Sequence, residues 1–237
     1  MKKKKILLVG SEGSIGVNVF NSLKKKYDVI RIDKKKISKI SYFNCNMNDD
    51  KKASKVFKKI KIKFKHIDIL INCVGQIHNE LLLRYEKKFI THSINTWRDV
   101  LNNNLNSTFV SCKFFIDNFC VDQKNKNEKL IINFSSVNSI GVAGQSAYSS
   151  SKSAIETFTT VLSKELGFLN VRAACIAPGY FDLKSTNYNL SKEKKTNKIN
   201  EISLRRFGKI NELINAINFI IKNKFYNGKV LKIDGGL

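Results

Sequence analysis

The sequence predicts an α/β protein with a doubly wound parallel sheet and helices on both faces. Short apolar segments alternate with amphipathic segments along the whole chain of 237 residues, a pattern typical of right-handed strand–helix–strand units. A glycine-rich turn joins the first strand to the first helix, and the single proline leaves no proline-rich linker. A chain of this length suits one α/β domain with a full core, so we expect a single domain over residues 1–237.

The expected strands are short runs of apolar and β-branched residues, and the expected helices carry apolar residues at helical spacing. In chain order, the strands are expected at residues 5–9, 28–32, 40–45, 67–72, 130–135, 171–176 and 229–233. The helices are expected at residues 14–26, 50–64, 93–119, 147–167 and 210–222. Two stretches are irregular, the polar, lysine-rich 180–204 and Gln76 to Thr91. Long connections in a compact domain are usually functional, so both are expected to border a pocket.

A glycine-rich turn follows the first strand. The turn reads Gly10-Ser11-Glu12-Gly13-Ser14-Ile15-Gly16 and leads into the first helix. Glycines three residues apart allow a tight turn and the close approach of a pyrophosphate to the backbone. A helix N-terminus also offers N–H groups and a partial positive charge to phosphates. We therefore expect the phosphates of a dinucleotide at Gly10, Ser11, Gly13, Ser14, Ile15 and Gly16.

The second strand ends in Asp33. An acidic side chain at this place accepts hydrogen bonds from the adenosine ribose and repels a 2′-phosphate. The adjacent Lys34, Lys35 and Lys36 offset part of that repulsion. Asp33 therefore favours NAD(H) over NADP(H), with NADP(H) left open.

A phenol and an amine lie one turn apart in the expected helix 147–167. Tyr148 and Lys152 share one helix face, so we expect the ammonium to lower the pKa of the phenol from its usual value of ~10. Tyr148 would then exchange a proton near neutral pH. The buried strand 130–135 delivers Ser136 to its carboxyl end, the edge at which open α/β sheets bind ligands.

These residues make the chain resemble the short-chain dehydrogenase/reductase family over nearly its whole length. The matching segments follow in the order of the family: the glycine turn, Asn72-Cys73-Val74-Gly75, Asn104, Ser136, the Tyr148 and Lys152 pair, Pro178-Gly179, Arg206-Phe207-Gly208 and Asp234-Gly235-Gly236. Ser14 stands where single-domain members carry the middle glycine of the turn, so the G-x-x-G-x-x-G spacing is more similar to the extended branch.

The resemblance implies a Rossmann-type fold and a set of site residues. In the family, Tyr148 would give a proton to the substrate oxygen, which Ser136 would hold in place. Lys152 would act on Tyr148 and on the nicotinamide ribose, and Asn104 would anchor a water that links Lys152 to solvent. The implied catalytic residues are Asn104, Ser136, Tyr148 and Lys152. The implied cofactor-binding residues are Gly10, Ser11, Gly13, Ser14, Ile15, Gly16, Asp33, Asn46, Asn72, Val74, Gly75, Tyr148, Lys152, Pro178 and Gly179.

Two positions depart from the family pattern. Leu183 stands near the place of a threonine that often touches the nicotinamide amide in the family, and Ser185 or Thr186 could take that role. Asn46 ends the third strand where many members carry an aspartate beside the adenine. An amide can still form a hydrogen bond there.

The resemblance implies an NAD(P)-dependent oxidoreductase that interconverts a ketone and a secondary alcohol. Two substrate classes stay open: a 3-oxoacyl thioester on a carrier protein, whose reductases share the wording of Gln145 to Tyr148, and a sugar or nucleotide sugar of surface polysaccharide synthesis. A dinucleotide-binding scaffold without turnover is the alternative from another class. The family also implies a homodimer or homotetramer joined through helices 93–119 and 147–167, and a substrate loop at about 180–204.

Other chemistries find little support in the sequence. Ser149 to Lys152 fits S-x-x-K, but the companion S-D-N and K-T-G elements are missing. His66, His78 and His92 lack the H-x-x-x-H and H-E-x-x-H spacings of metal sites. We therefore expect no metal and place all three histidines on the surface or in loops, with His78 and His92 flanking a loop that could touch substrate.

The formal net charge of +24 comes from lysines spread along the chain. No aromatic-rich nucleic-acid module accompanies them, so we expect a solvated surface that attracts anionic substrates and no nucleic-acid partner. No apolar run approaches the ~18 residues of a membrane span, and no signal peptide precedes the first strand. The five cysteines form no C-x-x-C pair. We therefore expect a cytoplasmic protein without a membrane partner.

Overall fold

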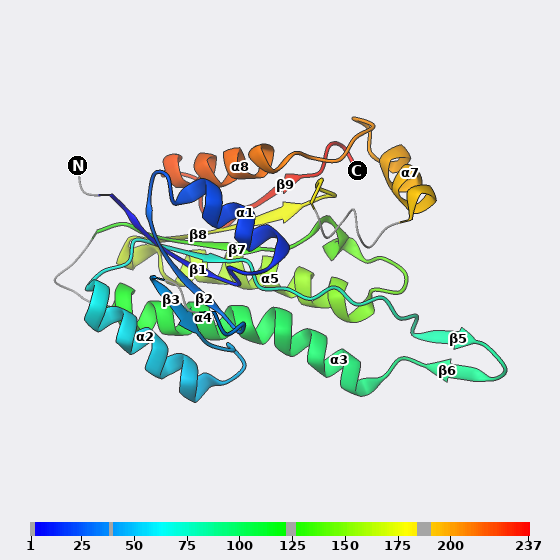
Figure 1. Ribbon diagram of the computed structural model, residues 1–237, viewed down its shortest axis with the longest axis horizontal. Coiled ribbons are helices and arrows are strands. Elements are labelled where there is room, and N and C mark those ends of the chain that lie inside the picture. The colour runs from blue at the N-terminus through cyan, green and yellow to red at the C-terminus, as the bar shows by residue number, and fades with distance from the viewer. Residues whose placement is uncertain (1–2, 38–39, 122–126, 184–190) are drawn as a thin grey trace.

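Seven parallel strands form the central sheet of the computed structural model, which describes residues 3–37, 40–121, 127–183 and 191–237. The strands are β1 (Lys5–Val9), β2 (Asp28–Asp33), β3 (Tyr42–Asn44), β4 (Ile69–Asn72), β7 (Lys129–Phe134), β8 (Val171–Pro178) and β9 (Val230–Ile233). Their order across the sheet is β3-β2-β1-β4-β7-β8-β9, and every pair is parallel (Figure 1). The predicted doubly wound parallel sheet is confirmed.

Helices follow most of these strands. They are α1 (Ser14–Leu23), α2 (Asp50–Phe64), α3 (Ile94–Leu101), α4 (Ser107–Phe115), α5 (Ser146–Glu165), α7 (Lys192–Glu201) and α8 (Ile210–Lys222). The π-helical turn η1 (Asn102–Asn106) joins α3 to α4, and the π-helical turn η2 (Ile116–Cys120) follows α4. The helix expected at 93–119 is therefore present as a continuous helical run, but two π-helical turns interrupt its α-helical geometry. None of the helices in the described ranges combines the length and apolarity that a membrane span requires.

The alternation of side chains along each strand divides the core into two halves. Ile6 and Leu8 face one side, where they pack with residues of α1 and α8. Leu7 and Val9 face the other side, where they pack with residues of α2, α4 and α5. Figure 1 shows the two helical layers on opposite faces of the sheet. Because both faces are covered, the central strands β1 and β4 are almost wholly apolar, as parallel strands in such folds are.

Two elements differ from the sequence expectation, and both lie in the stretches expected to be irregular. The stretch from Gln76 to Thr91 contains a hairpin of β5 (Leu83–Tyr85) and β6 (Phe89–Thr91). The stretch 180–204 contains α7, which starts at the cap Ser191 and has no buried side chain in the described chain. Its lysines hide the helical spacing of apolar residues that the prediction relied on.

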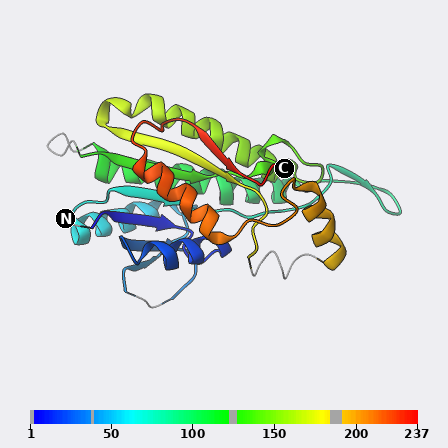
Figure 2. The ribbon, with the colours of Figure 1, turned by 90° about the horizontal axis from the view of Figure 1, so that it is seen from above.

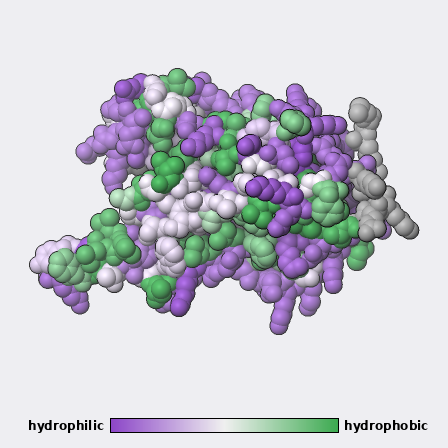
Figure 3. Space-filling model, turned by 180° about the vertical axis from the view of Figure 1, so that it is seen from behind, coloured by the Kyte–Doolittle hydropathy of each residue, from purple (hydrophilic) through white to green (hydrophobic). Residues whose placement is uncertain are grey.

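The hairpin and α7 lie at the end of the molecule to which the parallel strands point (Figures 1 and 2). The hairpin extends beyond the body of the protein and carries exposed apolar side chains, visible at its tip and base in Figure 3. They are Leu81, Leu82, Leu83, Tyr85 and Phe89. The two stretches that the sequence left irregular therefore flank the carboxyl edge of the sheet.

Phe115→Ala is expected to lower the free energy of unfolding by about 3–5 kcal/mol, because Phe115 is fully buried between α4 and the sheet. Phe225→Ala is the matched control, because Phe225 is 99% exposed and surface substitutions change stability by only about 0.5 kcal/mol. Urea unfolding of both variants measures the difference. Equal losses in the two variants would contradict the assignment of α4 to the core.

Candidate active site

A continuous cleft runs along the carboxyl edge of the sheet. One part is lined by residues that include Gly10, Asp33 and Asn46. The other part is lined by residues that include Ser136 and Tyr148. Both parts share the lining residues Gly13, Cys73, Val74 and Gly75, so the two pockets meet where β1 and β4 lie side by side. This is the switch point at which open α/β sheets bind ligands.

The glycine turn brings backbone close to this cleft. Gly10 has a φ of +78°, and a Cβ on it would lie 2.8 Å from the Cys73 carbonyl carbon. A Cβ on Gly16 would lie 2.1 Å from the Gly10 oxygen, so a larger residue would push α1 off the turn. Gly13 holds the N-cap position of α1, and Ser14 and Ile15 line the cleft beside it. The N–H groups of a first helical turn lack intrahelical partners and suit a phosphate.

The end of β2 fixes a carboxylate beside the turn. The Glu12 N–H donates to Asp33 Oδ2 at 2.9 Å, and the Lys35 N–H donates to Asp33 Oδ1 at 3.0 Å. The Glu12 side chain pairs with Arg31 at 3.2 Å. Asn46 lines the same pocket. The negative charge of Asp33 is thus held at a defined place at the carboxyl end of its strand.

Ser136 and Tyr148 come together on the other side of the cleft. Ser136 caps the short 3-10 helix η3 (Val137–Ile140), because its Oγ accepts from the Asn138 N–H at 3.2 Å. Tyr148 lies in the first turn of α5, and its side chain forms a hydrogen bond with that of Ser136. The serine and the phenol therefore both line this part of the cleft, with their hydroxyl groups close together.

Lys152 lies one turn further along α5 and is buried, with 3% of its surface exposed. Its Nζ donates to the Phe134 carbonyl at 2.9 Å and lies 5.8 Å from the centre of the Tyr148 ring. Burial lowers the pKa of Lys152 to about 8. A Cβ on Gly75 would lie 3.1 Å from this Nζ, so the glycine keeps space for the lysine.

The expected lowering of the Tyr148 pKa is wrong for this structure. Burial raises the pKa of the phenol above its usual value, and the hydrogen bond with Ser136 opposes this by a smaller amount. The ammonium is directed to the Phe134 carbonyl rather than to the phenol oxygen. Helical spacing identified the neighbours correctly, but it carried no information on how far both groups are withdrawn from water.

Asn104 is buried in the π-helical turn η1. Its Oδ1 accepts from the Gln76 N–H at 2.6 Å, and its Nδ2 donates to the Gln76 carbonyl at 3.1 Å and to Ser151 Oγ at 2.9 Å. The side chain therefore joins the segment after β4 to helix α5. Single π-helical turns are frequent at functional sites.

Some of the residues predicted to bind the cofactor do not line the cleft with their side chains. Asn72 points into the core, where its Nδ2 donates to Asn133 at 2.8 Å and its Oδ1 accepts from Ser111 at 2.6 Å. Ser11 is buried, and its Oγ has no hydrogen-bond partner among the described residues. Pro178 and Gly179 do line the pocket.

The residues along the cleft fit an extended dinucleotide. The glycine turn leaves space for a pyrophosphate where any Cβ would collide with backbone. Asp33 lies at one end of the cleft and Ser136 with Tyr148 at the other. The phosphate, ribose and reactive-ring positions of a dinucleotide thus each have matching residues in one cleft.

The substrate end of the pocket is apolar on one side. Tyr180, Phe181 and Leu183 line it together with Ile77. Leu183 offers no hydrogen-bonding side chain, as the sequence indicated. Ser185 and Thr186, the suggested substitutes, lie outside the described residues.

Sequence reasoning missed four residues that hold the site in place. The Ser135 hydroxyl contacts the Lys152 carbonyl at 3.0 Å and Glu156 Oε1 at 2.7 Å. Ser151 accepts from Asn104, and Gln76 acts through its backbone. Glu156 is four residues after Lys152, so the i, i+4 rule offered a signal for it. Gln76 offered none, because any residue supplies the same backbone groups.

Comparisons with known proteins agree with this geometry. A family model described as Enoyl-(Acyl carrier protein) reductase matches residues 14–237. The chain is 31% identical over 202 residues to a 3-oxoacyl-(acyl-carrier-protein) reductase of Thermotoga maritima, covering 84% of this chain and 77% of that protein. It is 30% identical over 195 residues to carbonyl reductase family member 4 of Danio rerio, covering 82% and 76%.

Solved structures share the fold. A short-chain dehydrogenase from Leptospira borgpetersenii with bound NAD+ superposes with a TM-score of 0.85 at 24% identity, covering 100% of this chain and 93% of the other. At this identity the likeness concerns the fold alone. The order of the strands and the two helical layers therefore form a fold that is already known from solved structures.

Lys152→Met is expected to remove a pH-dependent part of the stability. The folded-state pKa of about 8 is below the ordinary 10.5, so the unfolded chain binds more protons between these values and the wild type gains stability as the pH rises through them. The Tm of the variant relative to wild type should therefore fall as the pH rises from about 8 to about 10.5. Lys164→Met, on the exposed side of α5, is the control and should show no such trend. A constant Tm difference for Lys152→Met would contradict a lowered pKa.

Proposed function

Because the chain belongs to the short-chain dehydrogenase/reductase family, an oxidoreductase family that interconverts ketones and secondary alcohols with NAD(P), we propose that its cleft reduces a 3-oxoacyl thioester on a carrier protein. The observation that carries the proposal is the convergence of Ser136, Tyr148 and Lys152 on a cleft that begins at the glycine turn. A proton donor, an oxygen-binding hydroxyl and a cation thus meet at the reactive end.

Tyr148 is the proton donor of the proposed reaction. When bound, the dinucleotide supplies or accepts the hydride at the carbonyl carbon. Tyr148 gives its proton to the oxygen on which negative charge develops, and the Ser136 hydroxyl holds that oxygen through a hydrogen bond. A phenol whose pKa is raised by burial stays protonated at neutral pH, which suits the reducing direction.

Lys152 assists Tyr148 in two ways. Its ammonium stabilises the phenolate that remains after proton transfer, and its position beside Gly75 suits contact with a ribose hydroxyl. Its pKa of about 8 leaves it mostly protonated at neutral pH and able to pass on a proton. Asn104 is a positioning residue, since it fixes Gln76 and Ser151 on either side of the lysine.

We propose NAD(H) as the preferred cofactor. Asp33 is held by two backbone N–H groups at the end of the cleft, where it would accept hydrogen bonds from ribose hydroxyls and repel a 2′-phosphate. Lys34 and Lys35 line the same pocket and weaken this repulsion without removing it. Asn46 is proposed to contact the adenine.

The lining of the pocket and the overall charge of the protein both support an acyl substrate on a carrier protein. The apolar side chains of Tyr180, Phe181 and Leu183 border the reactive end and suit an acyl chain. The net charge of +24 would raise the rate of encounter with an acidic carrier protein. Reductases of carrier-linked 3-oxoacyl groups are also among the relatives.

We further propose that residues 1–237 act as one domain in a homodimer or homotetramer in the cytoplasm. Exposed apolar side chains on α4 and α5, among them Phe109 and Val161, support an assembly through these helices. The five cysteines carry free thiols, which supports a reducing compartment.

Tyr148→Phe should lower turnover of a 3-oxoacyl thioester by about 10²–10⁴-fold, because it removes the proton donor, while dinucleotide binding stays within a factor of about two. Tyr226→Phe is the control, since Tyr226 packs on Phe219 outside the cleft. Steady-state kinetics with NADH and fluorescence binding of NADH measure the two effects.

The outcomes separate the proposals. Normal turnover of Tyr148→Phe would show that the acid is a different residue. Reduction of keto-sugars alone would overturn the acyl substrate but keep the oxidoreductase. Tight NADH binding without turnover on either class would favour a scaffold.

The wild type should bind NADH more tightly than NADPH. Asp33→Ser should reduce the ratio of the NADPH dissociation constant to the NADH dissociation constant, because the carboxylate no longer repels the 2′-phosphate. Asp28→Ser, at the opposite end of the same strand, should leave the ratio unchanged. Isothermal titration with both dinucleotides measures this. Tighter binding of NADPH by tenfold or more, about 1.4 kcal/mol, would overturn the role of Asp33.

A further inference from the structure

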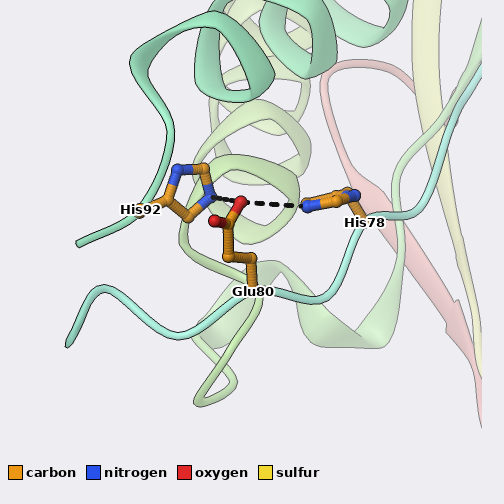
Figure 4. Close-up of side chains that lie close together, drawn as sticks. All are labelled: His78, Glu80 and His92. Atoms are coloured by element: carbon orange, nitrogen blue, oxygen red, sulfur yellow. Dashed lines mark hydrogen bonds and ion pairs between the residues drawn. The ribbon is translucent and has the colours of Figure 1, made fainter. Parts of the chain in front are cut away.

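Two histidines and a glutamate meet at the base of the β5–β6 hairpin. His78 and Glu80 lie on the segment that leads into the hairpin, and His92 lies where the chain returns toward α3 (Figure 4). All three histidines lie outside the helices and strands, as expected, but the side chain of His92 is only 5% exposed. Glu80 is 16% exposed and His78 is 35% exposed.

The three ligand atoms have the spacing of a metal site. Glu80 Oε2 lies 3.2 Å from His78 Nε2 and 3.6 Å from His92 Nε2, and all three atoms lie within 4.8 Å of one another. A tetrahedral zinc ion with bonds of ~2.0–2.2 Å separates its ligand atoms by about 3.3–3.5 Å. The 3.6 Å contact is too long for a hydrogen bond, but it matches this separation.

The backbone of Ser93 orients two of the ligands, His92 and Glu80. His92 Nδ1 lies 2.9 Å from the Ser93 carbonyl, and the Ser93 N–H donates to Glu80 Oε1 at 3.3 Å. A carbonyl oxygen only accepts, so Nδ1 carries a hydrogen and Nε2 of a neutral His92 presents its lone pair to Glu80 Oε2. A metal ion placed between these two atoms would accept electron pairs from both. Outer contacts of this kind are typical of metal-bound histidines.

We propose that His78, Glu80 and His92 bind a zinc ion that fastens the base of the hairpin. Two imidazole nitrogens and one carboxylate oxygen are a ligand set suited to zinc, with a fourth position open to water. Mg²⁺ prefers oxygen ligands and is not expected here. The proposal is independent of the reaction at Tyr148.

The zinc site would hold the hairpin segment against the start of the catalytic helix. The Glu80 N–H donates to the Gly144 carbonyl at 2.7 Å, and Gln145 Nε2 donates to Asn79 Oδ1 at 2.8 Å. Gln145 in turn accepts from Asn138, whose N–H donates to Ser136 Oγ. A metal at Glu80 would therefore fix the segment that borders the substrate end of the cleft.

The only tryptophan of the chain reports on this site. The rings of His92 and Trp97 are 6.5 Å apart and nearly perpendicular, so a change in the state of His92 alters the emission of Trp97. Zn²⁺ titrated into the full-length, chelator-treated protein should change the fluorescence until one ion is bound per chain. Mg²⁺ at the same concentrations should produce no change.

Matched variants separate this site from accidental binding. His78→Ala and Glu80→Gln remove a ligand but keep the His92–Trp97 pair, and each should weaken zinc binding by about 100-fold or more. His66→Ala removes a histidine that precedes β4 at the opposite end of the sheet, and Glu86→Gln changes a carboxylate at the exposed tip of the hairpin. Both controls should bind zinc like the wild type.

Hydrogen–deuterium exchange supplies a second measurement that does not depend on fluorescence. Zinc should slow exchange in residues 81–91 of the wild type but not of His78→Ala. The His78 side chain is partly exposed, so its removal should not impair folding. The circular dichroism spectrum of the variant should match that of the wild type. Absence of saturable zinc binding, or equal binding by the ligand variants and the wild type, would overturn the proposal.

Discussion

The buried ammonium of Lys152 is the constraint on which the rest of the site depends. It donates to the carbonyl at the end of β7, so the start of α5 is fixed against the strand that carries Ser136. Burying a charge is costly unless the charge forms hydrogen bonds. Gly75 has no side chain that would push the ammonium away from its hydrogen-bond partner, since a Cβ there would lie 3.1 Å from Nζ.

Polar contacts around Lys152 hold three separate segments of the chain together. Asn104 connects the chain after β4 to α5, and the Ser135 hydroxyl connects the end of β7 to Glu156. These contacts are buried or partly buried, so removing one partner would leave another with a lost hydrogen bond and little access to water. The π-helical turn η1 carries Asn104 and places its amide among these contacts.

The base of the hairpin is hydrogen-bonded to the segment that precedes α5. This base contacts Gly144 and Gln145 beside the start of helix α5, while the tip of the hairpin exposes apolar side chains. A segment with so little core of its own depends on its base for order. The His78, Glu80 and His92 cluster occupies that base, so binding there and the shape of the substrate end would be physically linked.

The sequence by itself determined the parallel sheet, the glycine turn and the approach of Ser136, Tyr148 and Lys152, because these follow from local periodicity and from the rule that parallel strands end at one edge. It also indicated Asp33 at the end of β2. Only the tertiary structure decided that Asn72 faces the core, that the Tyr148 pKa rises and that two distant histidines meet at Glu80. Burial and contacts between remote segments depend on how all the layers pack, and no local spacing in the chain encodes them.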